Sequence, residues 1–202
     1  MRPGDRRPTA AGCGRGAYAG GMTNPTQSAP NDPTQSATDS PPESAGRAAT
    51  ESVWDYPRPP ALRACPAEIE VRFAGTVICR TSSSWQVLET SHPPTYYLPR
   101  ASFVDGVLRE AAGTSFCEWK GSARYLDVAV GDRAAERVAW YYPQPTAGFA
   151  VLVDHLALYA GPMDEVLVDG ERVVPQPGGF YGGWITSAVT GPFKGVPGSH
   201  GW

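Results

Sequence analysis

The chain has 202 residues, with 17 basic and 20 acidic side chains and a formal net charge of −3. It lacks the basic excess of a general nucleic-acid-binding protein, and no apolar run approaches the roughly 20 residues that span a bilayer, so we predict neither a nucleic-acid nor a membrane partner. Glycine (23 residues) and proline (21 residues) exceed a fifth of the chain, which indicates many turns and irregular segments.

Residues 1–52 differ in composition from the rest of the chain. They contain one aromatic residue, Tyr18, and no Trp, Phe, Ile, Leu or Val, whereas residues 53–202 hold all six Trp and all six Phe. Without large apolar side chains, a segment cannot offset a backbone ordering cost of ~1–2 kcal/mol per residue. We therefore predict a disordered low-complexity tail over 1–52 and a single mainly-β domain over 53–202.

The chain's beginning does not have the form of a secretion signal. Residues 1–21 are rich in Arg and Gly and hold no apolar stretch of signal length. We therefore expect a cytoplasmic protein, and we regard Met22 as a candidate for the true start.

Strand patterns dominate the first part of the domain. Glu68–Phe73 alternates charged and apolar residues, as expected of a strand with one solvated face. Ala74-Gly75 then turns the chain into a strand at Thr76–Cys79. Further short strands are predicted at Trp85–Glu89 and Tyr96–Leu98.

One helix is predicted after these strands. Ser102–Asp105 has the form of a capping box, with Asp in place of the usual Glu. Four apolar residues then fall on one helix face: Phe103, Val104, Val107 and Leu108. Gly113 would end this helix.

Strand patterns resume in the second part of the domain. The predicted strands are Arg124–Val130, Glu136–Tyr142 and Phe149–Tyr159, the last interrupted by Asp154-His155. Asp169-Gly170 lies between Glu165–Val168 and Glu171–Val174, and Asp-Gly is a strong hairpin signal because both turn positions need positive φ. Residues 177–202 are rich in Gly and aromatic residues, so we predict an irregular strap laid across the sheet by its rings. The fold class is all-β with one short helix.

Lysine is used sparingly. Of the 17 basic residues only Lys120 and Lys194 are lysine, and each stands between an aromatic residue and a glycine. An ammonium is compact, binds as a point charge and loses its proton when desolvated, which a guanidinium does not. We infer a lysine that contacts an anionic or carbonyl group of a ligand. The alternative is a turn in which glycine bends the chain while the lysine points to water.

Two further patterns suggest chemistry. Cys117 precedes Lys120 by three residues, and a thiol beside an ammonium becomes a better nucleophile. The alternative for this cysteine is a small buried apolar residue. Glu89 and His92 are three residues apart, and a bend at Ser91 would bring them together as an acid–base pair. The alternative is a turn in which the histidine bonds to backbone.

Aromatic residues are dense around these positions: Tyr96, Tyr97, Trp119, Tyr125, Trp140, Tyr141 and Tyr142. They form either a slot for a planar or cationic ligand or a core built from large rings. Neighbouring residues of a strand face opposite sides, so at most one of Tyr96 and Tyr97 belongs to a pocket.

The cysteines do not predict a metal site. Cys13, Cys65, Cys79 and Cys117 form no C-x-x-C pair, which argues against structural zinc of the usual spacing. We expect free thiols, no metal and no cofactor.

Four segments resemble the bacterial family catalogued as domain of unknown function 427: Val53–Pro60, Glu89–Pro99, Cys117–Tyr125 and Trp140–Pro143. The resemblance covers roughly residues 53–175, and Glu118 stands where members often carry Pro. It implies a small β-tent fold, similar to domains that bind zinc or small ligands between two splayed sheets. The zinc cysteines of other β-tent proteins are missing here.

The resemblance also implies where a ligand binds. In the family, the Glu-x-x-His and Cys-x-x-Lys segments fall at the ligand cleft, which corresponds here to Glu89, His92, Cys117 and Lys120. The family has been associated with nucleotidyl transfer, but the chain has no acidic pair with a Gly-Ser phosphate turn, so we do not expect that reaction.

Three hypotheses follow for the function. The first is a pocket that binds a small polar ligand, with charge from Lys120, hydrogen bonds from Glu89 and His92, and aromatic walls. The walls would be Tyr97, Trp119, Tyr125 and Trp140. The second is an enzyme in the same cleft, with His92 as a general base oriented by Glu89 and with Cys117 or Lys120 as nucleophile. The third is a protein-interaction module, with the tail as tether and the strap as adhesive surface.

Overall fold

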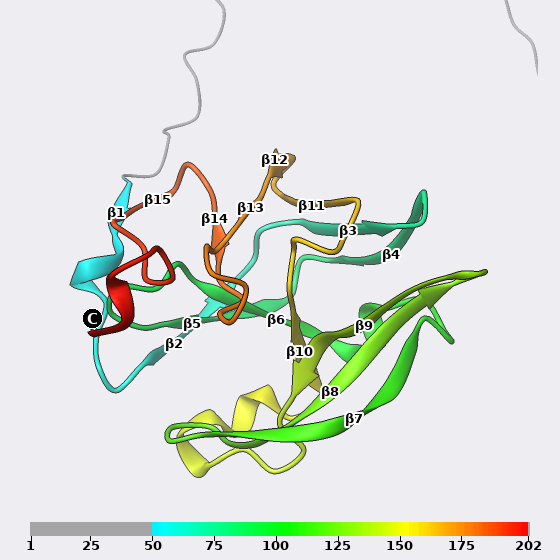
Figure 1. The fold of residues 1–202 in the computed structure, drawn as a ribbon, viewed down its shortest axis with the longest axis horizontal. Helices are drawn as coiled ribbons and strands as arrows, with labels where there is room; N and C mark the ends of the chain where they lie inside the picture. The colour runs from blue at the N-terminus through cyan, green and yellow to red at the C-terminus, as the bar shows by residue number, and fades with distance from the viewer. Residues whose placement is uncertain (1–49, 202) are drawn as a thin grey trace, which may run out of the picture. The chain divides into compact units, whose positions relative to one another are not determined.

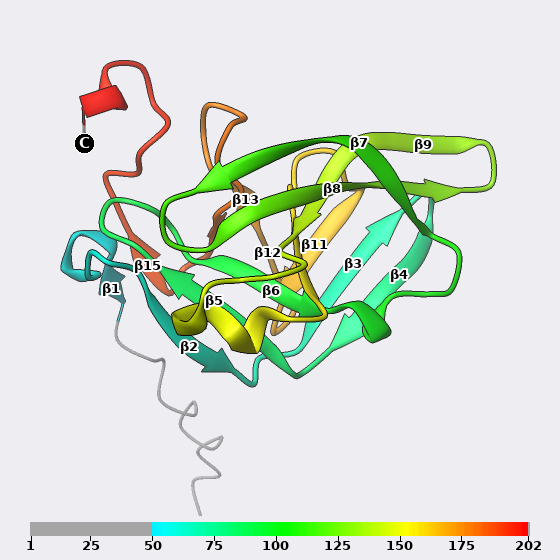
Figure 2. The ribbon, with the colours of Figure 1, turned by 90° about the horizontal axis from the view of Figure 1, so that it is seen from below.

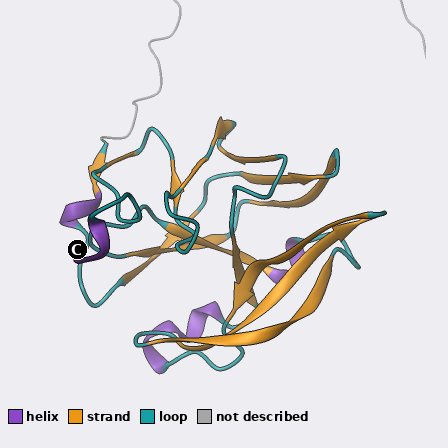
Figure 3. Ribbon diagram, viewed as in Figure 1, coloured by secondary structure: helices purple, strands orange, loops and turns teal. Residues whose placement is uncertain are grey.

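The computed structural model describes residues 50–201, and this part of the chain is mainly β, as predicted (Figure 1). Most of the predicted tail, the proposed start at Met22 and Cys13 lie outside the described residues. The helical segments within residues 50–201 are short 3-10 turns rather than an α-helix (Figure 3). They are η1 (Val53–Asp55), η2 (Arg100–Ser102), η3 (Ala147–Leu152) and η4 (Ser199–Gly201). No described helix is both long and apolar enough to cross a membrane.

A seven-stranded antiparallel sheet forms one layer of the fold. Its strands, in spatial order, are β2 (Ala61–Cys65), β5 (Ser84–Leu88), β6 (Thr95–Pro99), β10 (His155–Leu158), β9 (Arg133–Tyr141), β8 (Gly121–Val130) and β7 (Leu108–Cys117). The two faces of this sheet pack differently: one faces the main core, and the other carries the candidate site described below.

A four-stranded antiparallel sheet forms the second layer (Figure 2). It contains β12 (Glu171–Arg172), β11 (Glu165–Val168), β3 (Ile69–Phe73) and β4 (Thr76–Thr81), in that order. The alternating apolar residues of β3 pack in one buried cluster with side chains from β6, β8, β9 and β10. The main core therefore lies between the two sheets. The predicted strand and its apolar face are confirmed, but the expected solvated face is not, because Glu70 is buried.

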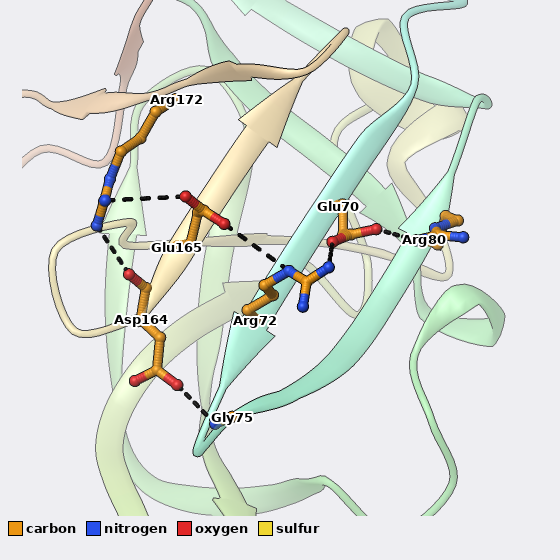
Figure 4. Close-up of polar contacts among 7 residues, drawn as sticks. All are labelled: Glu70, Arg72, Gly75, Arg80, Asp164, Glu165 and Arg172. Atoms are coloured by element: carbon orange, nitrogen blue, oxygen red, sulfur yellow. Dashed lines mark hydrogen bonds and ion pairs between the residues drawn. The ribbon is translucent and has the colours of Figure 1, made fainter.

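The opposite face of the four-stranded sheet is held by ion pairs (Figure 4). Glu70 is only 6% exposed and lies between the guanidinium groups of Arg72 and Arg80. Glu165 continues the chain of charges, with ion pairs to Arg72 and Arg172 at 3.8 Å. The guanidinium of Arg80, and next that of Arg72, holds the pKa of Glu70 below its usual range. Glu70 and Glu165 already form ion pairs with arginines, so we assign this face a role in stabilising the sheet and not in binding a ligand.

The predicted Asp169-Gly170 hairpin is confirmed. Asp169 and Gly170 have φ values of 49° and 78°, and Val168 pairs with Glu171 across the turn. This left-handed backbone is accessible to Asp and easy for Gly, which explains why the pair is so strong a signal.

The predicted helix after Ser102 is wrong. Only the 3-10 turn η2 precedes this point, and Leu108–Cys117 form the edge strand β7, paired along β8. Phe103 and Val107 are buried but Val104 is 52% exposed, so the apolar spacing does not mark one helix face. Pairing with β8 overrides the local helix signal. Most side chains of β7 are exposed, so its sequence shows no alternation of apolar and polar residues that would indicate a strand.

The predicted strand at Phe149–Tyr159 is correct only in its second half. Ala147–Leu152 form the 3-10 segment η3, and the strand β10 starts at His155. Asp154 has a φ of 61°, which ends the first segment and turns the chain into β10.

The first strand of the domain pairs with a strand near its C-terminal end. β1 (Glu51–Ser52) pairs in parallel with β15 (Val189–Thr190), so the folded chain begins slightly before the boundary expected from composition. Within the strap, β14 (Trp184–Ile185) pairs with β13 (Val174–Pro175). Trp184 is 1% exposed and belongs to the main core, whereas Phe180 is 77% exposed. The strap thus contributes both core and surface.

Candidate functional site

A cavity of about 520 Å³ lies against the face of the seven-stranded sheet opposite the main core. Its walls come from the end of β5 and the start of β6, from the β7–β8 hairpin, from β9 and from the C-terminal strap. All the site residues expected from the sequence line it: Glu89, His92, Tyr97, Cys117, Trp119, Lys120, Tyr125 and Trp140. Tyr97 faces this cavity while Tyr96 packs in the main core, as strand alternation requires.

Lys120 is held in a buried position by the β7–β8 turn. Residues 118–120 form the turn, and Gly121, with a φ of 94°, pairs with Cys117 to close it. The lysine is only 8% exposed, so its side chain does not extend into water. Its Nζ lies 5.8 Å from the ring centroid of Tyr142 and 5.6 Å from that of Phe149. Within residues 50–201, no carboxylate pairs with this ammonium at salt-bridge distance.

The surroundings of Lys120 stabilise its charge only in part. Aromatic faces attract a cation by roughly 0.5–2 kcal/mol. Burial of an ammonium without an anionic partner costs more than this unless other polar groups compensate. The site is therefore suited to an anion or to a strongly polar acceptor.

His92 is placed in the cavity by a bend in the chain. Ser91 has a φ of 68°, and its N–H donates to the carbonyl of Val53 at 3.0 Å, so the bend expected at this residue is present. The imidazole packs edge-on against Tyr181, with ring centroids 4.5 Å apart. Burial, followed by the charges of Lys194, Arg58 and Lys120, lowers the pKa of His92 to about 4. At neutral pH this imidazole is uncharged.

The partner that orients His92 is Gln176, not Glu89. The side-chain amide of Gln176 lies 3.1 Å from Nδ1 of the imidazole. The carboxylate of Glu89 instead faces Arg58, at 3.7 Å, and Arg58 also donates to Glu118 at 3.0 Å. The expected Glu89–His92 pair is thus replaced by two separate arrangements on one cavity wall.

Cys117 and two tyrosines form the inner part of the cavity. The rings of Tyr97 and Tyr142 are 6.4 Å apart, and both side chains pack with Cys117 in one apolar cluster. Burial raises the pKa of both phenols, and the nearby Tyr97 and Cys117 raise that of Tyr142 further. These hydroxyls therefore stay protonated and able to donate. Trp119 adds a buried indole N–H that has no acceptor among the described residues.

The strap closes one side of the cavity. The hydroxyl of Tyr159 donates to the carbonyl of Phe180 at 3.1 Å, which fixes the tip of the strap loop. Gly182 lies so close to Trp140 that a Cβ at this position would overlap the indole. The sequence predicts a strap across the sheet, but no local pattern indicates that the strap forms a cavity wall or that Gln176 and Arg58 contribute to the site, because these contacts join residues far apart in the sequence.

No group of three or more His, Cys, Asp or Glu side chains in the described part of the chain could hold a metal ion. The cavity offers hydrogen-bond donors, two carboxylates that face Arg58, and aromatic surface. Such a set is typical of a site for an organic ligand.

Comparison with known proteins agrees with the predicted family. The model of a family described as Domain of unknown function (DUF427) matches residues 61–169, which is more than half of the chain. A search of curated proteins finds no significant match. The matched range includes the cavity residues from Glu89 to Tyr159 but ends before Gln176 and the strap, so one wall of the cavity lies outside it.

Proposed function

The chain belongs to the DUF427 family, and from this premise we propose that it binds a small polar molecule in the aromatic-lined cavity, through the ammonium of Lys120. The observation that carries the proposal is the setting of this lysine. It is buried, it faces two aromatic rings, and no carboxylate within residues 50–201 neutralises it. A ligand acceptor would supply the missing partner, and rings such as Tyr97 and Trp140 would cover the rest of the ligand.

A ligand screen, in which the affinity of each hit is also measured for one variant, tests this proposal. Lys120→Met keeps the length and apolar stem of the side chain and removes the charge. We expect compounds that stabilise the wild-type protein in a thermal-shift screen to bind Lys120→Met at least ~10-fold more weakly by calorimetry, because a hydrogen bond to a charged group contributes about 1.5–3 kcal/mol.

The matched control removes a cation outside the cavity. Arg109 is exposed on β7 and does not line the cavity, so Arg109→Met changes the net charge equally without touching the site. Ligand affinity should stay within about 2-fold of wild type in this control. If every ligand bound Lys120→Met as tightly as wild type, the proposal would be wrong.

Catalysis in the same cavity is the second candidate, because Cys117, Lys120 and His92 all line it. A thiol enzyme requires a reactive Cys117. Cys79 provides an internal reference: it is 1% exposed, and burial raises the pKa of its thiol to about 12.

Alkylation by iodoacetamide at pH 7, followed by peptide mass spectrometry, distinguishes these cases. We expect Cys79 to resist labelling in the folded protein, because thiolate is the reactive form and almost none is present. Labelling of Cys117 faster than a free model thiol, and its suppression by a bound ligand, would favour an enzyme. Slow labelling of Cys117 would favour binding alone. Rapid labelling of Cys79 would show that the core opens.

A further inference from the structure

We propose that Gln176 fixes the proton of His92 on Nε2, so that the cavity presents two donors, the His92 Nε2–H and the Lys120 ammonium, that select an oxyanion carried on a planar body. The oxyanion is a carboxylate or a phosphate, which share the same acceptor chemistry. This inference rests on the proposed function and names the class of ligand.

The side-chain amide of Gln176 has one possible orientation. Its Oε1 accepts a hydrogen bond from the backbone N–H of Gly183 at 3.0 Å, and its Nε2 donates to the backbone carbonyl of Lys194 at 2.8 Å. A backbone N–H can only donate and a carbonyl can only accept, so exchanging O and N would lose both bonds. Gln176 is 5% exposed, so water cannot readily replace either partner.

This orientation determines the tautomer of His92. Because Gln176 directs its NH₂ group at Nδ1, 3.1 Å away, that nitrogen must be the acceptor. The proton of the neutral ring then lies on Nε2. His92 lines the cavity and Gln176 does not, so the bonded Nδ1 edge is turned to the strap and the Nε2 edge is left for the cavity.

The charges around the cavity favour an anion. Three cations, Arg58, Lys120 and Lys194, line it together with two carboxylates, Glu89 and Glu118. Both carboxylates face Arg58. Lys120 has no carboxylate partner within residues 50–201, so its ammonium is the charge that a ligand oxyanion would meet. A ligand oxyanion can accept from the lysine and the imidazole together, whereas a cation would meet two donors, and both carboxylates of the lining already face Arg58.

The cavity is larger than a single anion and has an apolar rim. A volume of about 520 Å³ falls in the range of sites for whole organic molecules. Phe116 of the β7–β8 hairpin and Phe180 of the strap both line it, although they are 78% and 77% exposed. A planar body attached to the oxyanion would cover these two rings.

The tautomer is tested without any ligand. Long-range ¹H–¹⁵N correlation spectra of histidine-labelled full-length protein at pH 7 distinguish the two nitrogens, and the His92→Gln spectrum assigns the signals. We expect a protonated Nε2 and an unprotonated Nδ1. A protonated Nδ1, or a doubly protonated ring, would overturn the assignment.

Ligand selection is tested with four probes: phenyl phosphate, benzoate, benzylamine and inorganic phosphate. We expect phenyl phosphate or benzoate to bind in calorimetry, and the tighter of the two identifies the oxyanion. Inorganic phosphate should bind at least ~10-fold more weakly than phenyl phosphate, because it leaves the apolar rim uncovered. Benzylamine should not bind. Tighter binding of benzylamine than of both anions would overturn the proposal.

A pair of variants isolates the donor of His92. A glutamine amide reaches the position of Nε2, whereas an asparagine amide reaches only that of Nδ1. We therefore expect His92→Gln to bind the preferred probe within about 3-fold of wild type and His92→Asn to bind it at least ~10-fold more weakly. Equal affinities of the two variants would contradict the donor role. If neither anion binds but a neutral compound binds in a Lys120-dependent way, the oxyanion inference fails and the proposed function stands. If no compound depends on Lys120, the proposed function fails.

Discussion

Replacing Trp184 with alanine is expected to lower the free energy of unfolding by about 3–5 kcal/mol, which is a large part of the 5–15 kcal/mol typical of a whole domain. The indole is 1% exposed and stacks on Tyr96 at 4.8 Å between ring centroids. Its Nε1–H also donates to the carbonyl of Leu158 in β10 at 3.0 Å. Alanine would leave a cavity in the main core and a buried carbonyl without its donor. Urea unfolding followed by circular dichroism measures the loss.

Trp184→Phe separates the two contributions. Phenylalanine keeps most of the stacking on Tyr96 but cannot donate to Leu158, so we expect a smaller loss of about 1–3 kcal/mol. Phe180→Ala is the matched control within the strap, because Phe180 is 77% exposed, and its effect should stay within about 0.5 kcal/mol. A Trp184→Ala variant as stable as this control would show that the strap is not part of the core.

This result bears on the hypothesis of an adhesive strap. A segment that places Trp184 in the main core and pairs Val189 with Glu51 cannot act as a free adhesive surface along its whole length. Its loop at residues 178–180 is exposed, as are shorter stretches at 187–188 and 197–198, and Phe180 of this loop lines the candidate site. The strap therefore serves the cavity and the core together.

The fold could be predicted from the sequence wherever one face of a strand is buried and the other solvated. The apolar residues of Ile69–Phe73 alternate and pack in the core, although Glu70 on the other face is buried by its ion pairs, and the Asp169-Gly170 turn needs a backbone that few residues adopt. The edge strand β7 could not be predicted, because most of its side chains are exposed and its local sequence favours a helix. Its extended form depends on pairing with β8, and a short stretch of sequence around β7 does not include this partner.

The candidate site could be located in part for a different reason. Lys120 and Cys117 stand in an unusual local setting, and the bend expected at Ser91 places His92 in the cavity. Gln176 carries no such signal, because its role depends on a hydrogen bond to a residue 84 positions away. Sequence proximity suggests Glu89 as one candidate partner of the imidazole, whereas the structure gives Gln176.

Acidification is expected to destabilise the wild-type protein more than His92→Gln, by about 2–3 kcal/mol between pH 7 and pH 3.5. Burial and three nearby cations lower the pKa of His92 from 6.5 to about 4 in the folded protein. Between these values the unfolded chain binds a proton that the folded protein does not, so stability falls as the pH drops through this window. A shift of one pKa unit corresponds to about 1.4 kcal/mol, and partial exposure of the ring reduces the total.

The comparison with His92→Gln is necessary because other groups lose their stabilising charge in the same range. Ion pairs and hydrogen bonds hold the pKa values of Glu51, Glu70 and Asp164 below their usual range. Folded carboxylates with lowered pKa values stabilise the protein above their unfolded pKa and lose this contribution as pH falls, in both proteins equally. The difference between the two unfolding curves, measured with urea at each pH, therefore isolates the imidazole. An NMR titration of His92 with a midpoint near 6.5, or parallel pH dependence of the two proteins, would show that burial and the nearby cations do not lower the pKa of this ring.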